Sequence, residues 1–335
     1  MRTRRQAAAV LALAACVALA PGLAAYLKLG VQVGTQVIPL RWAKMPVEYF
    51  ITNRDVDGVT APQLQAAVNN GFAAWGGVGT TVISSQFIGF VSADPASDDG
   101  ATVIGFVARP DLDMVLGATT HTVDATTGAI VDSDIFLNAA FNWSVAPGGQ
   151  TGRFDVQSIA THEIGHLLGL GHSALGETQL LASGGRRVLG KEAVMFPIAF
   201  PPGNISDRML KPDDAAGISD LYPTPAFSQQ TGSITGRVTL NGAGLFGAHV
   251  VAFNPATGKL VAGFALDAQG HFTIDGLAPA LYVLRAEPLD DADLDSFFNP
   301  DTVVNLNFRQ TYYSKLVAVP PGRAGPSIEI QVQPK

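Results

Sequence analysis

Residues 161–172 read THEIGHLLGLGH and contain three of the six histidines of the chain. On an α-helix, residues four apart lie on the same face, so His162 and His166 should project side by side. Two imidazoles placed in this way can both bind the same Zn²⁺ ion. Glu163 should point into the same cleft, where its carboxylate can take a proton from a metal-bound water.

The end of this stretch predicts a third ligand. Gly169 has no Cβ, so it can adopt the positive φ that ends a helix, and the turn should bring His172 back to the same ion. A single histidine on an apolar helix is more often a core residue, but three histidines at the spacing HExxHxxGxxH form a specific pattern. Three nitrogen ligands leave the fourth tetrahedral position open for water, which is typical of a catalytic site.

The spacing HExxHxxGxxH resembles that of the metzincin metallopeptidases. Ser173 directly after the third histidine, and the sequence VMFP at residues 194–197, resemble their matrixin branch. The resemblance extends over about residues 35–222. It implies an α+β zincin-like domain with a mixed twisted sheet and three helices, one catalytic Zn²⁺, and Glu163 as the general base.

The matrixin resemblance also implies roles for residues outside the zinc motif. Met195 would form an apolar floor beneath the imidazoles. Asp213 and Asp214 would be scaffolding carboxylates that tie a closing helix to the turn containing Met195 and to the N-terminal segment. An edge strand that includes Gly117 and Ala118 would bind an extended peptide by strand addition.

Three places in the chain contain acidic residues that could bind further metal ions. Matrixins carry a structural zinc bound by His and Asp, and this sequence offers His121, Asp132 and Asp134 but lacks the remaining histidines. We therefore expect a single catalytic zinc. A Ca²⁺ ion near Asp132 or Asp134 stays open, as it does for the acidic loops 94–100 and 290–295, where a solvated loop is the favoured interpretation.

Local patterns predict the other elements of this region. Thr60 and Gln63 form a capping box at the start of a helix whose apolar residues continue to Trp75, and Asp155 is the expected N-cap of the zinc-motif helix. Residues 173–193 form an insertion that is either a lid or specificity loop beside the cleft or an inert surface excursion. Alternating apolar residues predict strands at residues 47–52, 81–91, 101–107, 115–123 and 129–137.

A change of pattern marks the C-terminal region. Residues 223–232 are rich in proline and polar residues and predict a linker. Beyond it, short alternating strands separated by turn signals predict an all-β sandwich at residues 233–335. The sequence of residues 270–282 resembles the carboxypeptidase-regulatory-like (prealbumin-like) fold, with Ala280 where that family usually has Gly.

The N-terminus and the composition indicate where the protein acts. Residues 1–25 combine Arg2, Arg4 and Arg5 with a short apolar run and small residues, as in a secretory signal peptide, and residues 26–222 would then be the peptidase domain. A lipid anchor at Cys16, the only cysteine, is the alternative. The net charge is −7, so nucleic acid is not an expected partner. No permanent membrane span is expected.

These observations predict a secreted, monomeric zinc endopeptidase that acts on proteins or peptides. The alternative belongs to a different class of protein: a surface-binding or matrix-binding adhesion protein in which the C-terminal sandwich carries the main role.

Overall fold

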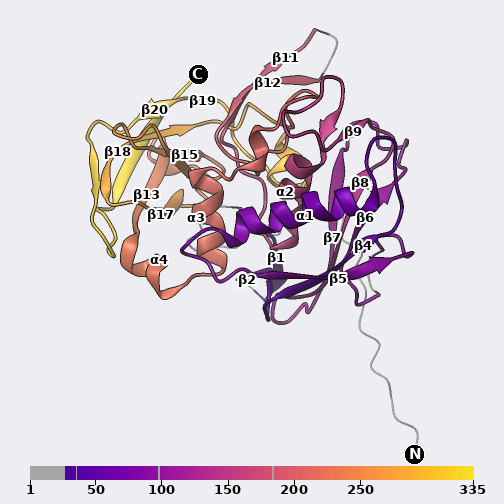
Figure 1. Cartoon of the computed structure of the whole chain (residues 1–335). Helices are drawn as coiled ribbons and strands as arrows, with labels where there is room; N and C mark the ends of the chain where they lie inside the picture. Colours follow the sequence, from indigo (N-terminus) through magenta and orange to yellow (C-terminus); the bar gives the residue numbers. More distant parts are fainter. Residues whose placement is uncertain (1–26, 35, 97–98, 183–184) are drawn as a thin grey trace, which may run out of the picture.

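The computed structural model describes residues 27–34, 36–96, 99–182 and 185–335. The expected signal peptide and Cys16 lie outside these residues. Figure 1 shows a helix-containing part, coloured from indigo through magenta to salmon, beside a β-rich part, coloured orange to yellow. Among the described residues, no helix combines the length and apolar character that crossing a membrane would require.

A six-stranded sheet forms the frame of the first part. Its strands are β3 (Arg41–Trp42), β4 (Val47–Thr52), β5 (Ser85–Val91), β6 (Val103–Val107), β7 (Gly117–Val123) and β8 (Ala129–Asn138). The pairs β4–β5, β4–β6, β6–β8 and β3–β8 are parallel. Strand β7 runs antiparallel along β8, with Thr119 opposite Ile135, and pairs with no other described strand. It is therefore an edge strand.

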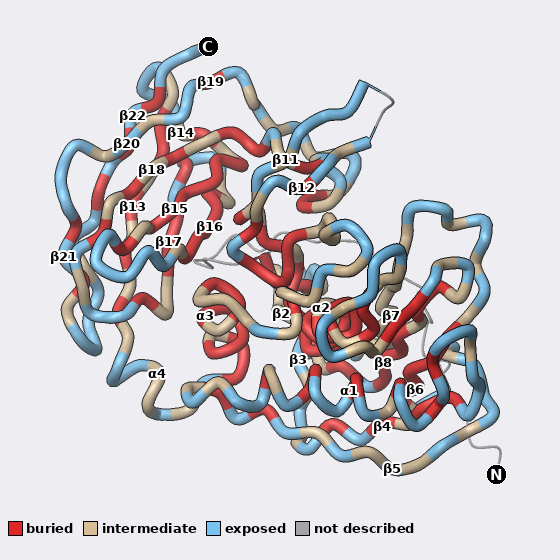
Figure 2. The backbone as a smooth tube through the Cα atoms, turned by 45° about the horizontal axis from the view of Figure 1, so that its top comes forward, coloured by how far each residue is buried: buried red, intermediate tan, exposed pale blue. Residues whose placement is uncertain are grey.

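Two long helices pack together beside this sheet. Helix α1 (Ala61–Gly76) begins with the expected capping box, in which the Thr60 N–H donates to Gln63 Oε1 at 2.8 Å. Helix α2 (Val156–Leu167) begins after Asp155, whose Oδ2 accepts from Ser158 N at 2.9 Å. Figure 2 shows that α2 is mostly buried at the centre of this part.

The insertion at residues 173–193 contains a hairpin of β11 (Gly176–Leu180) and β12 (Arg186–Lys191). The hairpin projects from the body of the molecule and is largely exposed towards its tip (Figure 2).

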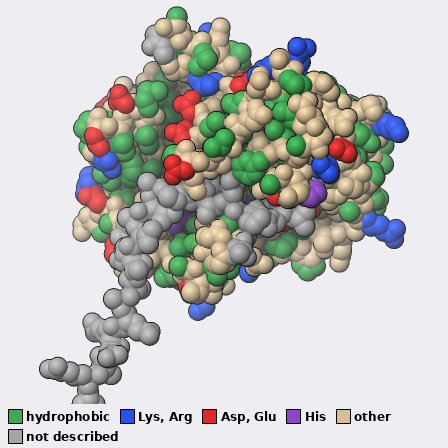
Figure 3. All heavy atoms as spheres, turned by 180° about the vertical axis from the view of Figure 1, so that it is seen from behind, with side chains coloured by type: hydrophobic (Ala, Val, Ile, Leu, Met, Phe, Trp, Pro, Cys, Tyr) green, Lys and Arg blue, Asp and Glu red, His purple; other side chains and the backbone are tan. Residues whose placement is uncertain are grey.

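On the face shown in Figure 3, Lys and Arg side chains lie scattered among acidic and neutral ones. The described residues on this face therefore form no continuous basic patch.

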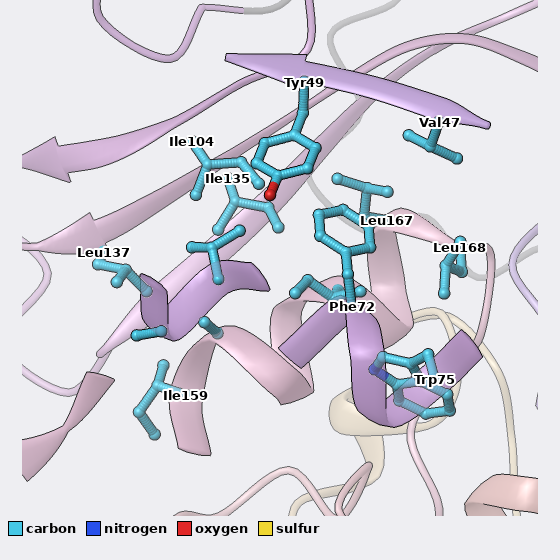
Figure 4. Packing of buried hydrophobic residues seen from close by; sticks show 14 of the residues in the cluster. Val47, Tyr49, Phe72, Trp75, Ile104, Ile135, Leu137, Ile159, Leu167 and Leu168 are labelled. Atoms are coloured by element: carbon cyan, nitrogen blue, oxygen red, sulfur yellow. The ribbon is translucent and has the colours of Figure 1, made fainter. Parts of the chain in front are cut away.

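The core of the first part lies between the sheet and helices α1 and α2. Tyr49 of β4 stacks on Phe72 of α1, with ring centroids 4.8 Å apart (Figure 4). Trp75 is fully buried, and its indole N–H donates to Thr161 O at 2.8 Å, which joins α1 to α2. Helix α2 is thus fixed both by apolar packing and by a buried hydrogen bond.

Shorter elements complete the first part and lead into the second. They are β1 (Gly30–Val33), β2 (Gln36–Pro39), β9 (Trp143–Ser144), β10 (Phe154–Asp155), the 3₁₀ turn η1 (Ser206–Arg208) and helix α3 (Pro212–Leu221). The expected linker at residues 223–232 contains a helix, α4 (Pro225–Gln230). Pro225 suits a first helical turn, and no residue of α4 is buried, so no apolar period marks it in the sequence.

The C-terminal region consists of two five-stranded sheets. One contains β13 (Gly232–Leu240), β14 (Ala243–Gly244), β17 (His271–Leu277), β19 (Phe308–Arg309) and β22 (Ile328–Pro334). The other contains β15 (His249–Phe253), β16 (Leu260–Phe264), β18 (Ala280–Glu287), β20 (Thr311–Tyr312) and β21 (Val317–Val319). Both sheets contribute to one apolar core, for example through Ile274 and Leu284. The region is therefore rich in β-structure, as the sequence predicts.

Candidate metal centre

Three histidines converge at the end of α2. His162 and His166 lie on successive turns of this helix, and His172 follows five residues after its last residue. The Nε2 atom of His166 lies 3.1 Å from the Nε2 atoms of both His162 and His172. Within the described residues, this is the one group of three or more metal-binding side chains whose ligand atoms approach within 4.8 Å of one another.

Each imidazole is held through its other ring nitrogen. The Nδ1 atom of His162 bonds to Val194 O at 2.8 Å, and that of His166 bonds to Leu170 O at 2.8 Å. The Nδ1 atom of His172 bonds to Ser296 O at 2.7 Å. Because a carbonyl oxygen only accepts, each Nδ1 carries a proton, and the three Nε2 lone pairs face one another. This donor set fits a zinc ion.

Burial keeps these imidazoles neutral, which is the form that binds a metal. Burial and the neighbouring His172 lower the pKa of His162 to about 3. The pKa values of His166 and His172 are also lowered, mainly by burial. The lone pairs are therefore available at neutral pH.

Gly169 turns the chain between the second and third histidines. Its φ is +97°, and its N–H donates to His166 O at 2.7 Å. The next residue, Leu170, donates to Gly165 O at 3.0 Å, which closes the helix end. A Cβ on Gly169 would lie 2.2 Å from Leu40 O, so both the backbone angle and the space require glycine.

Glu163 lies under the edge strand β7. The residue is only 5% exposed, and Thr119 Oγ1 donates to its Oε2 at 2.7 Å. A Cβ on Gly117 would lie 3.1 Å from Glu163 Oε1, and Ala118 beside it is half-buried. Burial raises the pKa of Glu163 to about 7, and the Thr119 hydrogen bond opposes this rise. No pattern in the sequence marks Thr119 as a partner of this carboxylate.

Met195 lies directly against the site helix. It is 2% exposed, and a Cβ on Gly165 would lie 2.3 Å from its Sδ. The carboxylate of Asp214 accepts from Val194 N at 2.8 Å and from Met195 N at 3.1 Å. Since Val194 O also holds His162, one carboxylate of α3 fixes the turn that supports both the ligand and the methionine.

Comparison with known proteins agrees with this geometry. A family model, Matrixin, matches residues 41–223, more than half of the 335 residues. The chain belongs to the matrixin family. The matched residues include all three histidines and Glu163, whereas Ser296 lies outside them.

Curated relatives of this matrixin are plant metalloendoproteinases. Metalloendoproteinase 1-MMP of Arabidopsis thaliana is 30% identical over 195 residues, which are 55% of this chain and 45% of that protein. Metalloendoproteinase 4-MMP of the same plant is 26% identical over 198 residues, 55% of this chain and 48% of that protein. Metalloendoproteinase 1 of Glycine max is 35% identical over 91 residues, 27% of this chain and 24% of that protein. The matched part spans less than half of each relative.

The hydrogen-bond partners of Asp213, the other carboxylate expected to act as scaffolding, differ from the expectation. Asp213 Oδ2 accepts from Ser173 Oγ at 2.7 Å, and its Oδ1 accepts from Ala262 N of β16 at 2.8 Å. Neither partner belongs to the N-terminal segment. That segment is instead held by an ion pair between Lys28 and Asp220. Asp213 therefore joins the metal centre to the C-terminal region.

Among the described residues, His121, Asp132 and Asp134 do not bring their ligand atoms within 4.8 Å of one another. His121 donates from Nε2 to His166 O at 2.9 Å, and burial lowers the pKa of His121 to about 4. Asp132 accepts from Gly100 N at 3.1 Å, and Asp134 accepts from Val103 N at 2.8 Å. His121 thus holds the C-terminal end of α2 through the carbonyl of His166.

Proposed function

We propose that this matrixin is a secreted zinc-dependent endopeptidase that hydrolyses peptide bonds in proteins. The observation that carries the proposal is the convergence of three Nε2 atoms beside the buried carboxylate of Glu163. The plant relatives described above are all metalloendoproteinases, which supports it. The expected signal peptide at residues 1–25 supports secretion, and the protein is proposed to act as a monomer.

The residues of the chain suggest how each would act. A zinc ion held by His162, His166 and His172 would supply the Lewis acid for carbonyl polarisation and water activation. Glu163 would accept the proton of the attacking water and pass it to the leaving amine nitrogen. Its raised pKa, about 7, suits a group that both takes and returns a proton near neutral pH.

The edge strand β7 is the proposed binding site for the substrate backbone. It pairs with β8 along one side only, so its other side can accept an extended peptide as a further strand. Gly117 and Ala118 lie at the start of this strand, and Gly117 lies against Glu163. A peptide bound there would therefore pass close to the general base.

Replacing Glu163 with Ala tests the proposal. We expect hydrolysis of casein to fall by at least about 10²-fold, because the proton acceptor is lost, while the zinc content stays at one ion per chain. The measurements are casein hydrolysis and metal analysis of the same preparation. Hydrolysis by the unaltered protein should also stop when a chelator is added and resume when zinc is restored.

Glu192→Ala is the matched control, because Glu192 is an exposed carboxylate outside the site. It should keep full activity. Hydrolysis by the Glu163→Ala variant at the rate of the unaltered protein would contradict the assigned role of Glu163.

A further inference from the structure

The third histidine is oriented by a residue that lies outside the matrixin region. The carbonyls that hold His162 and His166 belong to Val194 and Leu170, within residues 41–223. The carbonyl that holds His172 belongs to Ser296, 124 residues further along the chain. Ser296 ends the 3₁₀ turn η2 (Leu294–Ser296) of the C-terminal region.

Buried aromatic residues fix this turn. Phe297 follows Ser296 directly, is 1% exposed, and donates its N–H to Leu294 O at 3.0 Å. Its ring lies 6.1 Å from the ring of Phe264 in β16. Both belong to an apolar cluster that also contains Phe196, the residue after Met195. The position of the Ser296 carbonyl therefore depends on packing that joins the C-terminal region to the metal centre.

Two further contacts place the same surfaces together. Asp213 bridges Ser173, the residue after His172, and the backbone of Ala262 in β16. In the adjacent hairpin, Thr178 N donates to Asp291 Oδ1 and Thr178 Oγ1 donates to Asp291 O, both at 2.7 Å. The segment that begins at the third histidine is thus held by the C-terminal region at successive points.

We propose that the C-terminal region is a positioning part of the metal centre, with the Ser296 carbonyl orienting His172 for the metal. The proposal rests on the zinc site of the proposed function. A partner of the second ring nitrogen fixes the tautomer and the ring orientation of a metal-binding histidine, and losing such a partner weakens metal binding by roughly 10–100-fold. Zinc affinity should therefore depend on residues outside the matrixin region.

Replacing Phe297 with Ala tests this dependence. The variant is made in the full chain with Glu163→Gln, so that self-cleavage does not disturb the measurement. Zinc affinity is measured by competition with a chromophoric chelator, and we expect the zinc Kd to rise about 10-fold or more, because the turn that presents the Ser296 carbonyl loses its anchor.

Phe308→Ala is the matched control. Phe308 is a fully buried phenylalanine of the same region, but it belongs to the apolar core between the two sheets rather than to the cluster around Phe297. It should lower stability without changing the zinc Kd. Phe297→Leu, which keeps most of the buried volume, provides a milder variant if Phe297→Ala does not fold, and it should also weaken zinc binding measurably.

The outcomes separate this inference from the proposed function. Equal zinc Kd values for the folded Phe297 variants and the Glu163→Gln protein in which they are made, or equal weakening by Phe308→Ala in the same protein, would overturn the inference. A protein that binds zinc tightly but hydrolyses no peptide would overturn the proposed function and leave the positioning role intact.

Discussion

The buried carboxylates of this matrixin differ in how many hydrogen bonds stabilise their negative charge. Asp214 accepts backbone hydrogen bonds from Val194, Met195 and Lys211. Asp134 accepts one from Val103, and among the described residues its Oδ2 has no hydrogen-bond partner. Burial raises the pKa of Asp134 to about 7, so ionising this side chain costs stability in the folded state.

Replacing Asp134 with Asn should therefore stabilise the protein at pH 8, by on the order of 1 kcal/mol. Between the ordinary pKa of 3.8 and about 7, the folded chain binds more protons at this site than the unfolded chain, so the contribution of Asp134 to stability falls as pH rises. The gain should shrink towards zero at pH 4. Urea unfolding at both pH values, without added calcium, measures it.

The exposed Asp113 provides the matched control for this pH effect, as Asp113→Asn should change stability little at either pH. A gain in the Asp134→Asn variant that is as large at pH 4 as at pH 8 would contradict the explanation. A loss at pH 8 would do so as well, and would point instead to a cation bound by this carboxylate.

Among the elements, helix α2 begins and ends for different reasons. Its start is a local signal, because Asp155 is a capping residue type and caps its own helix through Ser158. Its end combines a local requirement with a distant one. Gly169 needs its positive φ, and its missing Cβ also leaves room for the carbonyl of Leu40, over a hundred residues earlier.

Replacing Gly169 with Ala should lower the free energy of unfolding by more than about 1 kcal/mol, through backbone strain and the clash with Leu40 O. Because this turn carries His172 to the site, the zinc content should fall as well. Thermal unfolding and metal analysis measure the two effects. Gly79→Ala is the control, since a Cβ there meets nothing within 4 Å. A Gly169→Ala variant with unchanged melting temperature and full zinc content would contradict this account.

Elements with local sequence signals could be predicted, whereas others could not. Thr60 and Gln63 indicate the start of α1 because a capping box is read within four residues. Helix α4 has no buried residue and so no apolar period, and the sequence predicts only a linker there. The strand expected at residues 81–91 begins at Ser85, since Thr81 instead forms a bridge to Pro223, a partner that sequence pattern does not reveal.

At the scale of the whole molecule, the contacts between the two parts could not be predicted. Every residue has a backbone carbonyl, so nothing in the residue type marks Ser296 as the partner of His172. The sequence predicts a separate sandwich after a linker. In the structure, Phe196 and Phe297 share one apolar cluster, and Ala193 and Ala262 share another. A role of the C-terminal region in binding surfaces stays a prediction, but its packing already links it to the metal centre.

We propose that three histidines hold a zinc ion with one position left open beside Glu163. A crystal structure of the zinc-supplemented full chain, with anomalous data collected at the zinc absorption edge, tests it most directly. We expect one zinc peak bound by the Nε2 atoms of His162, His166 and His172 and by no other protein atom. A map without zinc at these nitrogens, or with a fourth protein side chain bound to the ion, would contradict it.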